Sequence, residues 1–238
     1  MPMMVKKILI TGVSSGIGYA VCQKLLKKGI QVIGVCRRAT SSFSHKNYYP
    51  YNIDLSQPIK IDEKFKTIIK THRDIDSILS NAGVAMFGNL EQHSSDQIIE
   101  NININLLSHI LVIKNLLPTL KQQKTTTKII VIGSYAGLQG GRQGGIYCSA
   151  KFALQGLVES LQIDCASSNI KISIINPAII KGTNFYDDTY FEPADDILNS
   201  VDMDDVINSI MLCLDAKNGS VFAKINISVL KKSLKFKK

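Results

Sequence analysis

The chain has 238 residues, of which 45% are hydrophobic and 20% charged, enough to bury one substantial core. This composition excludes a disordered chain, a collagen and a small disulfide scaffold. No run of about 18 or more uncharged apolar residues occurs, so the sequence predicts no membrane-spanning helix.

Two features bear on the compartment. The five cysteines form no C-x-x-C pair and are odd in number, which favours a reducing environment. Lys6 and Lys7 precede an apolar stretch, as in a secretory leader, but Gly12, Gly16 and Gly18 interrupt it and no small-residue cleavage site precedes the next charge. We therefore expect a cytoplasmic protein.

The net charge of +9 is concentrated at the two ends of the chain. Residues 1–53 hold eight Lys or Arg and no acid, residues 231–238 hold five lysines, and residues 54–230 carry a net −4. Nucleic-acid binding would require basic residues interleaved with stacking aromatics, whereas these fall mostly on the first predicted helix or beside the second strand. No nucleic-acid partner is expected. The basic tail at 231–238 is expected to be an unstructured solvated end; contact with an anionic surface or a partner subunit is the alternative.

Short β-branched runs alternate with helical patterns, which is typical of a parallel sheet covered by helices on both faces. The sequence predicts a doubly wound α/β fold of about seven mostly parallel strands, in a single domain over residues 1–230. Strands are expected at 5–11, 31–36, 48–53, 75–80, 128–133, 170–176 and 221–229. Helices are expected at 16–28, 56–71, 95–120 (one helix or two in succession, ending near Pro118), 147–167 and 202–215.

Residues 11–18 read T-G-V-S-S-G-I-G, directly after the first strand and at the start of the first helix. Glycines permit a tight turn and close approach of a ligand, while free amides at a helix start attract a negative pyrophosphate. The alternative is a glycine-rich turn that binds nothing. The motif predicts a dinucleotide site formed by Gly12, Ser14, Ser15, Gly16, Ile17 and Gly18.

N-A-G at Asn81, Ala82 and Gly83 follows the fourth strand, and Asp54 ends the third in N-I-D-L. Alone, such an Asn is usually a turn residue and such an Asp a helix cap. With the T-G-x-x-x-G-x-G spacing, however, the chain resembles the short-chain dehydrogenase/reductase family from Val5 to about Val229. The resemblance implies a Rossmann-type fold, a homotetramer or homodimer, Asn81 near the adenine ribose and Asp54 at the adenine amino group.

The end of the second strand, G-V-C-R-R, bears on the choice of cofactor. NAD sites place a carboxylate about 20 residues past the glycines to bind the ribose 2′-hydroxyl. Cys36 stands there instead, and Arg37 and Arg38 follow with guanidinium groups suited to a 2′-phosphate. NADP is therefore favoured over NAD, the alternative being two solvated surface arginines.

Tyr147 and Lys151 lie four residues apart in Y-C-S-A-K, on one face of a predicted helix. That spacing alone is common, but Ser134 precedes Tyr147 by thirteen residues, at the end of the fifth strand. These three match the family's Ser, Tyr and Lys in order and spacing. Asn105 matches the Asn of the family tetrad, although the nearby Asn101 and Asn103 leave its register open.

Hydride transfer to a carbonyl leaves an alkoxide that must be protonated, and the reverse reaction must remove that proton. A tyrosine has a free pKa of about 10, which a neighbouring ammonium lowers by stabilising the phenolate. We therefore expect Tyr147 to be the general acid and base, with its pKa lowered by Lys151; the alternative is a half-buried aromatic at a helix start. The resemblance further implies that Lys151 holds the nicotinamide ribose, that Ser134 binds the substrate oxygen and that Asn105 carries a water linking Lys151 to solvent.

After the sixth strand the chain reads N-P-A-I-I-K-G-T, where the family usually shows Pro-Gly and then a Thr one residue earlier than here. Pro177 and Ile180 are expected cofactor contacts, and Thr183 is left open. Segment 184–200 mixes aromatic and acidic residues and is expected to be a substrate lid. Its acids could favour a cationic or polyhydroxylated substrate. The more common explanation for such acids is a loop face that is exposed to solvent. The four scattered histidines lack metal-ligand spacing, so no metal site is expected; His109, in an apolar stretch, is expected in the core or an interface.

Together these patterns predict an NADP(H)-dependent oxidoreductase that interconverts a small-molecule alcohol and a ketone or aldehyde. The alternative is a non-catalytic NADP(H) sensor of the same fold. A sensor has no need of the proton-transfer residues Ser134, Tyr147 and Lys151, so their presence favours the enzyme.

Overall fold

The computed structural model describes residues 5–39, 43–183, 185, 189, 191–217, 219–231 and 234–236. Its centre is a seven-stranded sheet in the order β3-β2-β1-β4-β5-β6-β8, in which every neighbouring pair is parallel. The strands are β1 (Lys7–Thr11), β2 (Gln31–Cys36), β3 (Tyr48–Asn52), β4 (Ser77–Ser80), β5 (Thr127–Ile132), β6 (Ile170–Pro177) and β8 (Lys224–Ile227). The predicted doubly wound α/β fold is confirmed.

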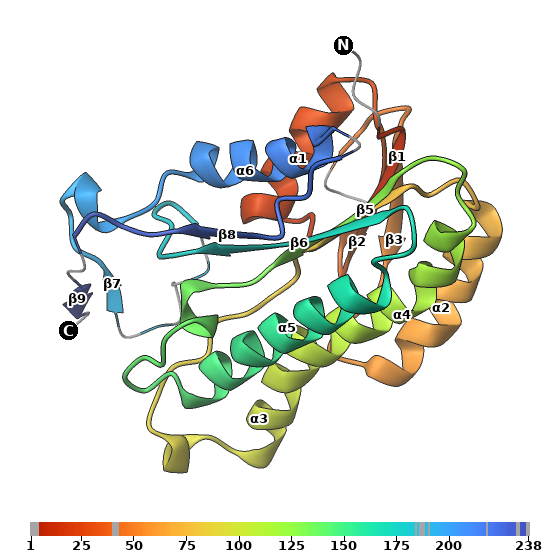
Figure 1. Ribbon diagram of the computed structural model, residues 1–238. Coiled ribbons are helices and arrows are strands. Elements are labelled where there is room, and N and C mark those ends of the chain that lie inside the picture. Colours follow the sequence, from red (N-terminus) through yellow and green to blue (C-terminus); the bar gives the residue numbers. More distant parts are fainter. Residues whose placement is uncertain are drawn as a thin grey trace.

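Helices cover both faces of this sheet (Figure 1). Helices α1 (Gly16–Lys27) and α6 (Met203–Asp215) share one face and pack in one hydrophobic cluster. On the other face, α2 (Pro58–Thr71), α4 (Ser108–Lys121) and α5 (Gly145–Asp164) form a second cluster, with α3 (Ser95–Ile102) beside α5. Two covered faces explain why the central strands read as continuous β-branched runs rather than as alternating patterns.

The order of the strands determines where the site lies. The chain runs from β1 outward through β2 to β3, then returns to place β4 on the other side of β1. Loops leaving β1 and β4 therefore diverge to opposite faces and leave a crevice at the carboxyl ends of the strands.

The stretch predicted as one or two helices over 95–120 contains a change of helical type. Helix α3 is followed by a π-helical turn at Asn103–Leu107 and then by α4. Pro118 does not end α4, which continues to Lys121, because Leu116 and Leu120 on either side of it are buried in the core.

The described part of the basic tail is not an unstructured end. Strand β9 (Leu234–Phe236) pairs antiparallel with β7 (Phe191–Pro193), and Figure 1 shows this ribbon apart from the main sheet. Regular pairing of the backbone with β7 therefore replaces the expected solvated coil. The tail residues Lys232, Ser233, Lys237 and Lys238 lie outside the described residues.

All five cysteines are buried, free thiols. Within the described ranges, no helix is both long and apolar enough to cross a membrane.

Candidate active site

A cavity of about 420 Å³ opens at the carboxyl ends of the parallel strands. Its wall is built from segments that follow six different strands. Lining residues that the sequence singled out are Gly12, Ser14, Ser15, Gly16, Ile17, Arg37, Arg38, Asp54, Asn81, Ala82, Gly83, Ser134, Tyr147, Lys151, Pro177, Ile180 and Thr183. The fold thus brings together motifs that are as much as 171 residues apart in the chain, counted from Gly12 to Thr183.

The glycine-rich turn after β1 has a backbone that only glycine adopts easily. Gly12 has a φ of +75°, and a Cβ there would lie 2.9 Å from Asn81 Nδ2. Gly18 does not line the cavity: a Cβ on it would lie 2.2 Å from the Gly12 carbonyl oxygen. Gly18 therefore allows α1 to pack against the turn, while Gly12 and the residues 14–17 line the cavity.

Asn81 ties the end of β4 to the end of β1. Its Nδ2 donates to the Thr11 carbonyl at 2.9 Å and to the Gly12 carbonyl at 3.3 Å. The backbone amides of Asn81 and Ala82 both donate to Thr11 Oγ1, at 2.9 and 3.0 Å. These bonds hold the N-A-G segment against the glycine-rich turn.

His109, on α4, braces the same segment from behind. Its Nε2 lies 2.9 Å from the Ala82 carbonyl oxygen and its Nδ1 lies 2.7 Å from Ser80 Oγ. Burial, reinforced by the charge of Lys151, lowers the pKa of His109 to about 3, although the bond to Ala82 opposes the shift. His109 thus lies in the core as a neutral imidazole that contacts the wall of the cavity.

Arg37 and Arg38 are exposed directly after β2, where they line the cavity opposite Asp54. Partial burial alone would raise the pKa of Asp54, but hydrogen bonds from Ser56 and the charge of Arg37 outweigh it and lower that pKa. The Ser56 hydroxyl and amide donate to Asp54 Oδ1 at 2.8 and 3.0 Å. This end of the cavity therefore holds an ionised carboxylate and two guanidinium groups.

Ser134, Tyr147 and Lys151 meet at the other end of the cavity. Ser134 and Tyr147 both line the cavity here, and the polar influence of the Ser134 side chain acts to lower the pKa of Tyr147. Lys151 Nζ lies 5.7 Å from the centroid of the Tyr147 ring and donates to the Ile132 carbonyl at 3.2 Å. Tyr147 and Lys151 are 5% and 3% exposed, so both polar heads are enclosed by protein.

The expected lowering of the Tyr147 pKa by Lys151 is not what the structure shows. Burial raises the pKa of Tyr147, and the Ser134 side chain opposes this only in part. Burial likewise lowers the pKa of Lys151 to about 8. Enclosure disfavours the charged form of both groups, and Lys151 is not among the groups that shift the pKa of Tyr147.

The π-helical turn presents Asn105 to this cluster. Asn105 Oδ1 accepts the Val84 amide at 3.1 Å, and its Nδ2 donates to the Val84 carbonyl at 2.9 Å. A Cβ on Gly83 would lie 3.0 Å from Asn105 Oδ1 and 3.6 Å from Lys151 Nζ, so both side chains converge on Gly83.

The two neighbouring asparagines lie elsewhere. Asn103 donates to the Ser56 carbonyl at 3.0 Å, and Asn101 is buried with no hydrogen-bond partner in the described part of the chain. Of the three, Asn105 is the one held beside Lys151. π-Helical turns are frequent at functional sites because the extra residue redirects a side chain.

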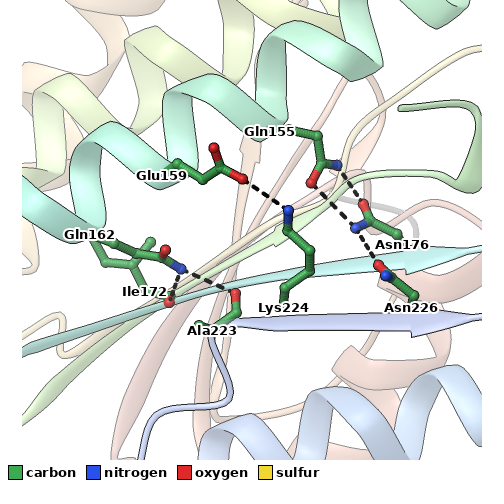
Figure 2. Close-up of polar contacts among 8 residues, drawn as sticks. All are labelled: Gln155, Glu159, Gln162, Ile172, Asn176, Ala223, Lys224 and Asn226. Atoms are coloured by element: carbon green, nitrogen blue, oxygen red, sulfur yellow. Dashed lines mark hydrogen bonds and ion pairs between the residues drawn. The ribbon is translucent and has the colours of Figure 1, made fainter. Parts of the chain in front are cut away.

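Sequence reasoning missed an amide network that anchors α5 to the sheet (Figure 2). Gln155 Nε2 donates to Asn176 Oδ1 at 2.7 Å, and Asn176 Nδ2 donates to Asn226 Oδ1 at 2.9 Å. Farther along α5, Gln162 donates to the carbonyls of Ile172 and Ala223. The helix that carries Tyr147 and Lys151 is therefore bonded through its side chains to β6 and β8.

Two phenylalanine rings pack against the Tyr147 ring. The centroids of Phe87 and Phe185 lie 5.4 and 5.8 Å from that of Tyr147. Phe191, on β7, packs edge-on against Phe87 with centroids 4.8 Å apart. The lid residues Asn184, Tyr186, Asp187, Asp188 and Tyr190 lie outside the described residues.

Pro177 ends β6, Ile180 and Thr183 follow it, and all three line the cavity. Thr183 Oγ1 donates to the Ile180 carbonyl at 3.4 Å. Over the described ranges, no group of three or more His, Cys, Asp or Glu is arranged to hold a metal ion.

Comparisons with known proteins agree with this fold. The sequence model of the short chain dehydrogenase family matches residues 6–191. The 3-oxoacyl-[acyl-carrier-protein] reductase FabG of Buchnera aphidicola is 33% identical over 181 residues, covering 74% of this chain and 73% of that protein.

Two solved structures are similar over nearly their whole length. An alcohol dehydrogenase from the archaeon Thermococcus sibiricus, complexed with 5-hydroxy-NADP, has a TM-score of 0.82 at 23% identity, covering 96% of this chain and 99% of that one. ElxO with NADP bound has a TM-score of 0.80 at 26% identity, covering 94% and 98%. The chain belongs to the short-chain dehydrogenase family of oxidoreductases.

Proposed function

We propose that this protein is an NADP(H)-dependent oxidoreductase that interconverts a ketone or aldehyde and the corresponding alcohol. The observation that carries the proposal is the single cavity that joins a glycine-rich dinucleotide turn to Ser134, Tyr147 and Lys151. A dinucleotide laid along this cavity from Arg37 toward Tyr147 has its reactive end beside the proton-transfer residues.

The residues at the first end fit an adenine dinucleotide phosphate. The positive φ of Gly12 and the free amides at the start of α1 suit a pyrophosphate. Arg37 and Arg38 supply positive charge for a 2′-phosphate, and Asp54 supplies an acceptor for the adenine amino group. Because similar solved structures hold NADP in some cases and NADH in others, the preference for NADP rests on the two arginines.

Proton transfer is assigned to Tyr147. Since burial raises its pKa, the phenol is protonated at neutral pH and can donate to the oxygen of a carbonyl undergoing reduction. When bound, the nicotinamide supplies the hydride that adds to the carbonyl carbon. The products are the alcohol and the oxidised cofactor, and Tyr147 then recovers its proton from solvent.

Three neighbours support that transfer. Ser134, which lines the cavity beside Tyr147, is assigned the role of holding the substrate oxygen through its hydroxyl. Lys151, with a pKa of about 8, carries its ammonium at neutral pH, and this charge stabilises the transient phenolate. Asn105, fixed by Val84, is assigned the water that returns protons to Lys151.

A cytoplasmic homodimer or homotetramer is part of the same proposal. Membership of the family and the buried, unpaired cysteines support it.

The direct test is NADPH oxidation at 340 nm with a panel of ketones, aldehydes and 3-oxoacyl thioesters, together with NADP-driven oxidation of alcohols. The proposal predicts turnover of at least one carbonyl class, with NADPH preferred over NADH. Tight NADPH binding without turnover of any panel member would instead favour a non-catalytic sensor. Failure to bind either nucleotide would reject both.

A further inference from the structure

The lid segment, residues 184–200, is closed at its base. On either side of it, Ile180 and Val201 pair through a parallel bridge. Within it, Phe185 lines the cavity, and its ring centroid lies 5.8 Å from that of Tyr147. The described part of the lid segment therefore contacts the end of the cavity where the proton-transfer residues meet.

A second contact runs from the lid segment to Tyr147 through two further rings. Phe191, on β7, is 6% exposed and packs edge-on against Phe87 with centroids 4.8 Å apart. The Phe87 centroid in turn lies 5.4 Å from that of Tyr147. Because closely packed rings transmit displacement, the position of β7 affects the packing around the phenol.

The basic tail holds β7 from outside. The chain runs from β8 to β9, which pairs antiparallel with β7 (Figure 1). In this register Lys235 is opposite Glu192. Lys235 Nζ lies 3.9 Å from a carboxylate oxygen of Glu192 and 3.3 Å from one of Asp195. The backbone of the tail and one of its lysines thus both contact the same strand and the turn after it.

Lys231 attaches the tail to the lid segment at a separate point. Its amide donates to the Leu198 carbonyl at 2.9 Å. Its Nζ lies 2.8 Å from Asp196 Oδ2. Two lysines of the tail and three acids of the lid segment therefore form a set of ion pairs across one boundary.

We propose that the basic tail is a strap that holds the lid segment closed over the substrate, with Lys231 and Lys235 as its positioning residues. Exposed ion pairs and a short two-stranded ladder are each weak. A fastening of this strength can open on the timescale on which substrates enter and products leave. The inference rests on the proposed function for its kinetic consequence, whereas the fastening itself is measured without a substrate.

The first test measures amide hydrogen exchange by mass spectrometry on the full chain, in peptides that cover residues 191–200. Lys231→Glu combined with Lys235→Glu replaces attraction by repulsion and should speed exchange there at least about threefold at about 50 mM salt. Lys231→Arg combined with Lys235→Arg keeps both charges and should exchange like wild type. Unchanged exchange in the glutamate variant, or equal acceleration in both variants, overturns the strap.

Wild type alone provides a second form of this test. Raising the salt concentration from about 50 mM to about 0.5 M screens ion pairs between exposed groups. Exchange in residues 191–200 should then become faster, while exchange in α2 stays the same. No change in residues 191–200 would overturn the role of charge.

Lys114→Glu is the matched control. The Lys114 side chain is 59% exposed and pairs at 2.9 Å with that of Asp62, which is 42% exposed, against 55% and 42% for Lys231 and Asp196. This pair joins α4 to α2, so its reversal should leave exchange of residues 191–200 unchanged. Acceleration in the control equal to that in the glutamate variant would show a general effect of charge and reject the strap.

The second test is kinetic and uses the best carbonyl substrate of the panel. The glutamate variant should raise KM at least about threefold, with kcat and the NADPH dissociation constant each changed less than about twofold, because the lid segment contributes to substrate binding. The arginine variant should match wild type. An unchanged KM, or a loss confined to kcat, would overturn control of substrate binding by the strap.

Failure of the underlying function has a different signature. If no carbonyl compound is turned over, the proposed function fails, while the exchange measurement still decides whether the tail fastens the lid segment. If carbonyl compounds are reduced but exchange is the same in all variants, the oxidoreductase stands and the strap is rejected.

Discussion

The buried imidazole of His109 donates its Nε2 proton to the Ala82 carbonyl oxygen, 2.9 Å away. A carbonyl only accepts, so Nε2 must carry the proton. Because burial lowers the pKa of His109 to about 3, Nδ1 is unprotonated at neutral pH and accepts from the Ser80 hydroxyl. The ring is therefore neutral, in one defined tautomer. It fixes the backbone that separates the cavity from the core.

This pairing predicts how stability depends on pH. In the unfolded chain His109 takes up a proton below about pH 6.5, whereas the folded protein does not protonate it until about pH 3. Stability linked to His109 is therefore complete above pH 6.5 and declines as the pH falls, approaching about 1.4 kcal/mol per pH unit. Urea unfolding between pH 7 and pH 4.5 should show a shallower decline for His109→Gln than for wild type.

His45→Gln is the control, because His45 is exposed. It should decline in parallel with wild type. Parallel declines for His109→Gln and wild type would contradict a neutral, buried His109.

Asn105 is expected to matter for turnover more than for cofactor binding. Asn105→Ala removes both bonds to Val84 and opens the space beside Lys151. We expect kcat to fall at least about tenfold, with the NADPH dissociation constant changed less than threefold and stability reduced by about 1–3 kcal/mol. Stopped-flow reduction and fluorescence titration measure the two effects separately.

Asn103→Ala provides the comparison within the same π-helical turn, since Asn103 contacts Ser56 rather than Lys151. Its kcat should stay near that of wild type. A similar kcat loss in both variants would point to collapse of the turn and not to a role for Asn105 itself.

Arg37 and Arg38 should discriminate between the two nicotinamide cofactors. Replacing both by alanine removes the charges expected to hold the 2′-phosphate, each charge-assisted bond contributing about 1.5–3 kcal/mol. NADPH binding should weaken at least about tenfold while NADH binding changes little, as measured by calorimetric titration. Arg142→Ala, an exposed arginine outside the cavity lining, should leave both affinities unchanged. Equal losses for NADPH and NADH in the double variant would refute the assignment.

The Gln155–Asn176 pair should stabilise the placement of α5 (Figure 2). Gln155→Ala leaves the buried Asn176 amide without this partner, so we expect the free energy of unfolding to fall by about 1–3 kcal/mol. Adding Asn176→Ala should cost less than the sum of the single changes, because the two side chains are bonded to each other in both directions. Strict additivity in urea denaturation would show that the pair is not coupled.

Much of the fold could be predicted because its signals are local. Apolar β-branched runs marked the central strands, and the glycine spacing marked the turn after β1. The bounds of the edge strand β8 were predicted less accurately: it occupies four residues of the nine expected. Its side chains are partly exposed and so leave little apolar pattern in the sequence. Strand β9 gave no signal, because the lysine-rich sequence of 231–238 predicts a solvated end and the pairing of β9 depends on β7.

The candidate site was predictable in residue type but not in its electrostatics. Spacing alone could not choose among the three asparagines, because a π-helical turn shifts the register that an α-helix would impose. The bracing of Ala82 by His109 joins parts of the chain 27 residues apart and leaves no local pattern. The pKa of Tyr147 was expected to fall, but burial, which depends on the whole fold, raises it.

Replacement of Tyr147 by phenylalanine tests the central claim most directly, since it removes one hydroxyl from a ring that Phe87 and Phe185 already hold in place. The measurement is kcat for the best carbonyl substrate beside the dissociation constant for NADPH, in the same preparation. We predict a fall in kcat of about 10²–10⁴-fold with NADPH affinity unchanged within about twofold. Turnover within about fivefold of wild type, with NADPH still bound, would contradict proton transfer by Tyr147.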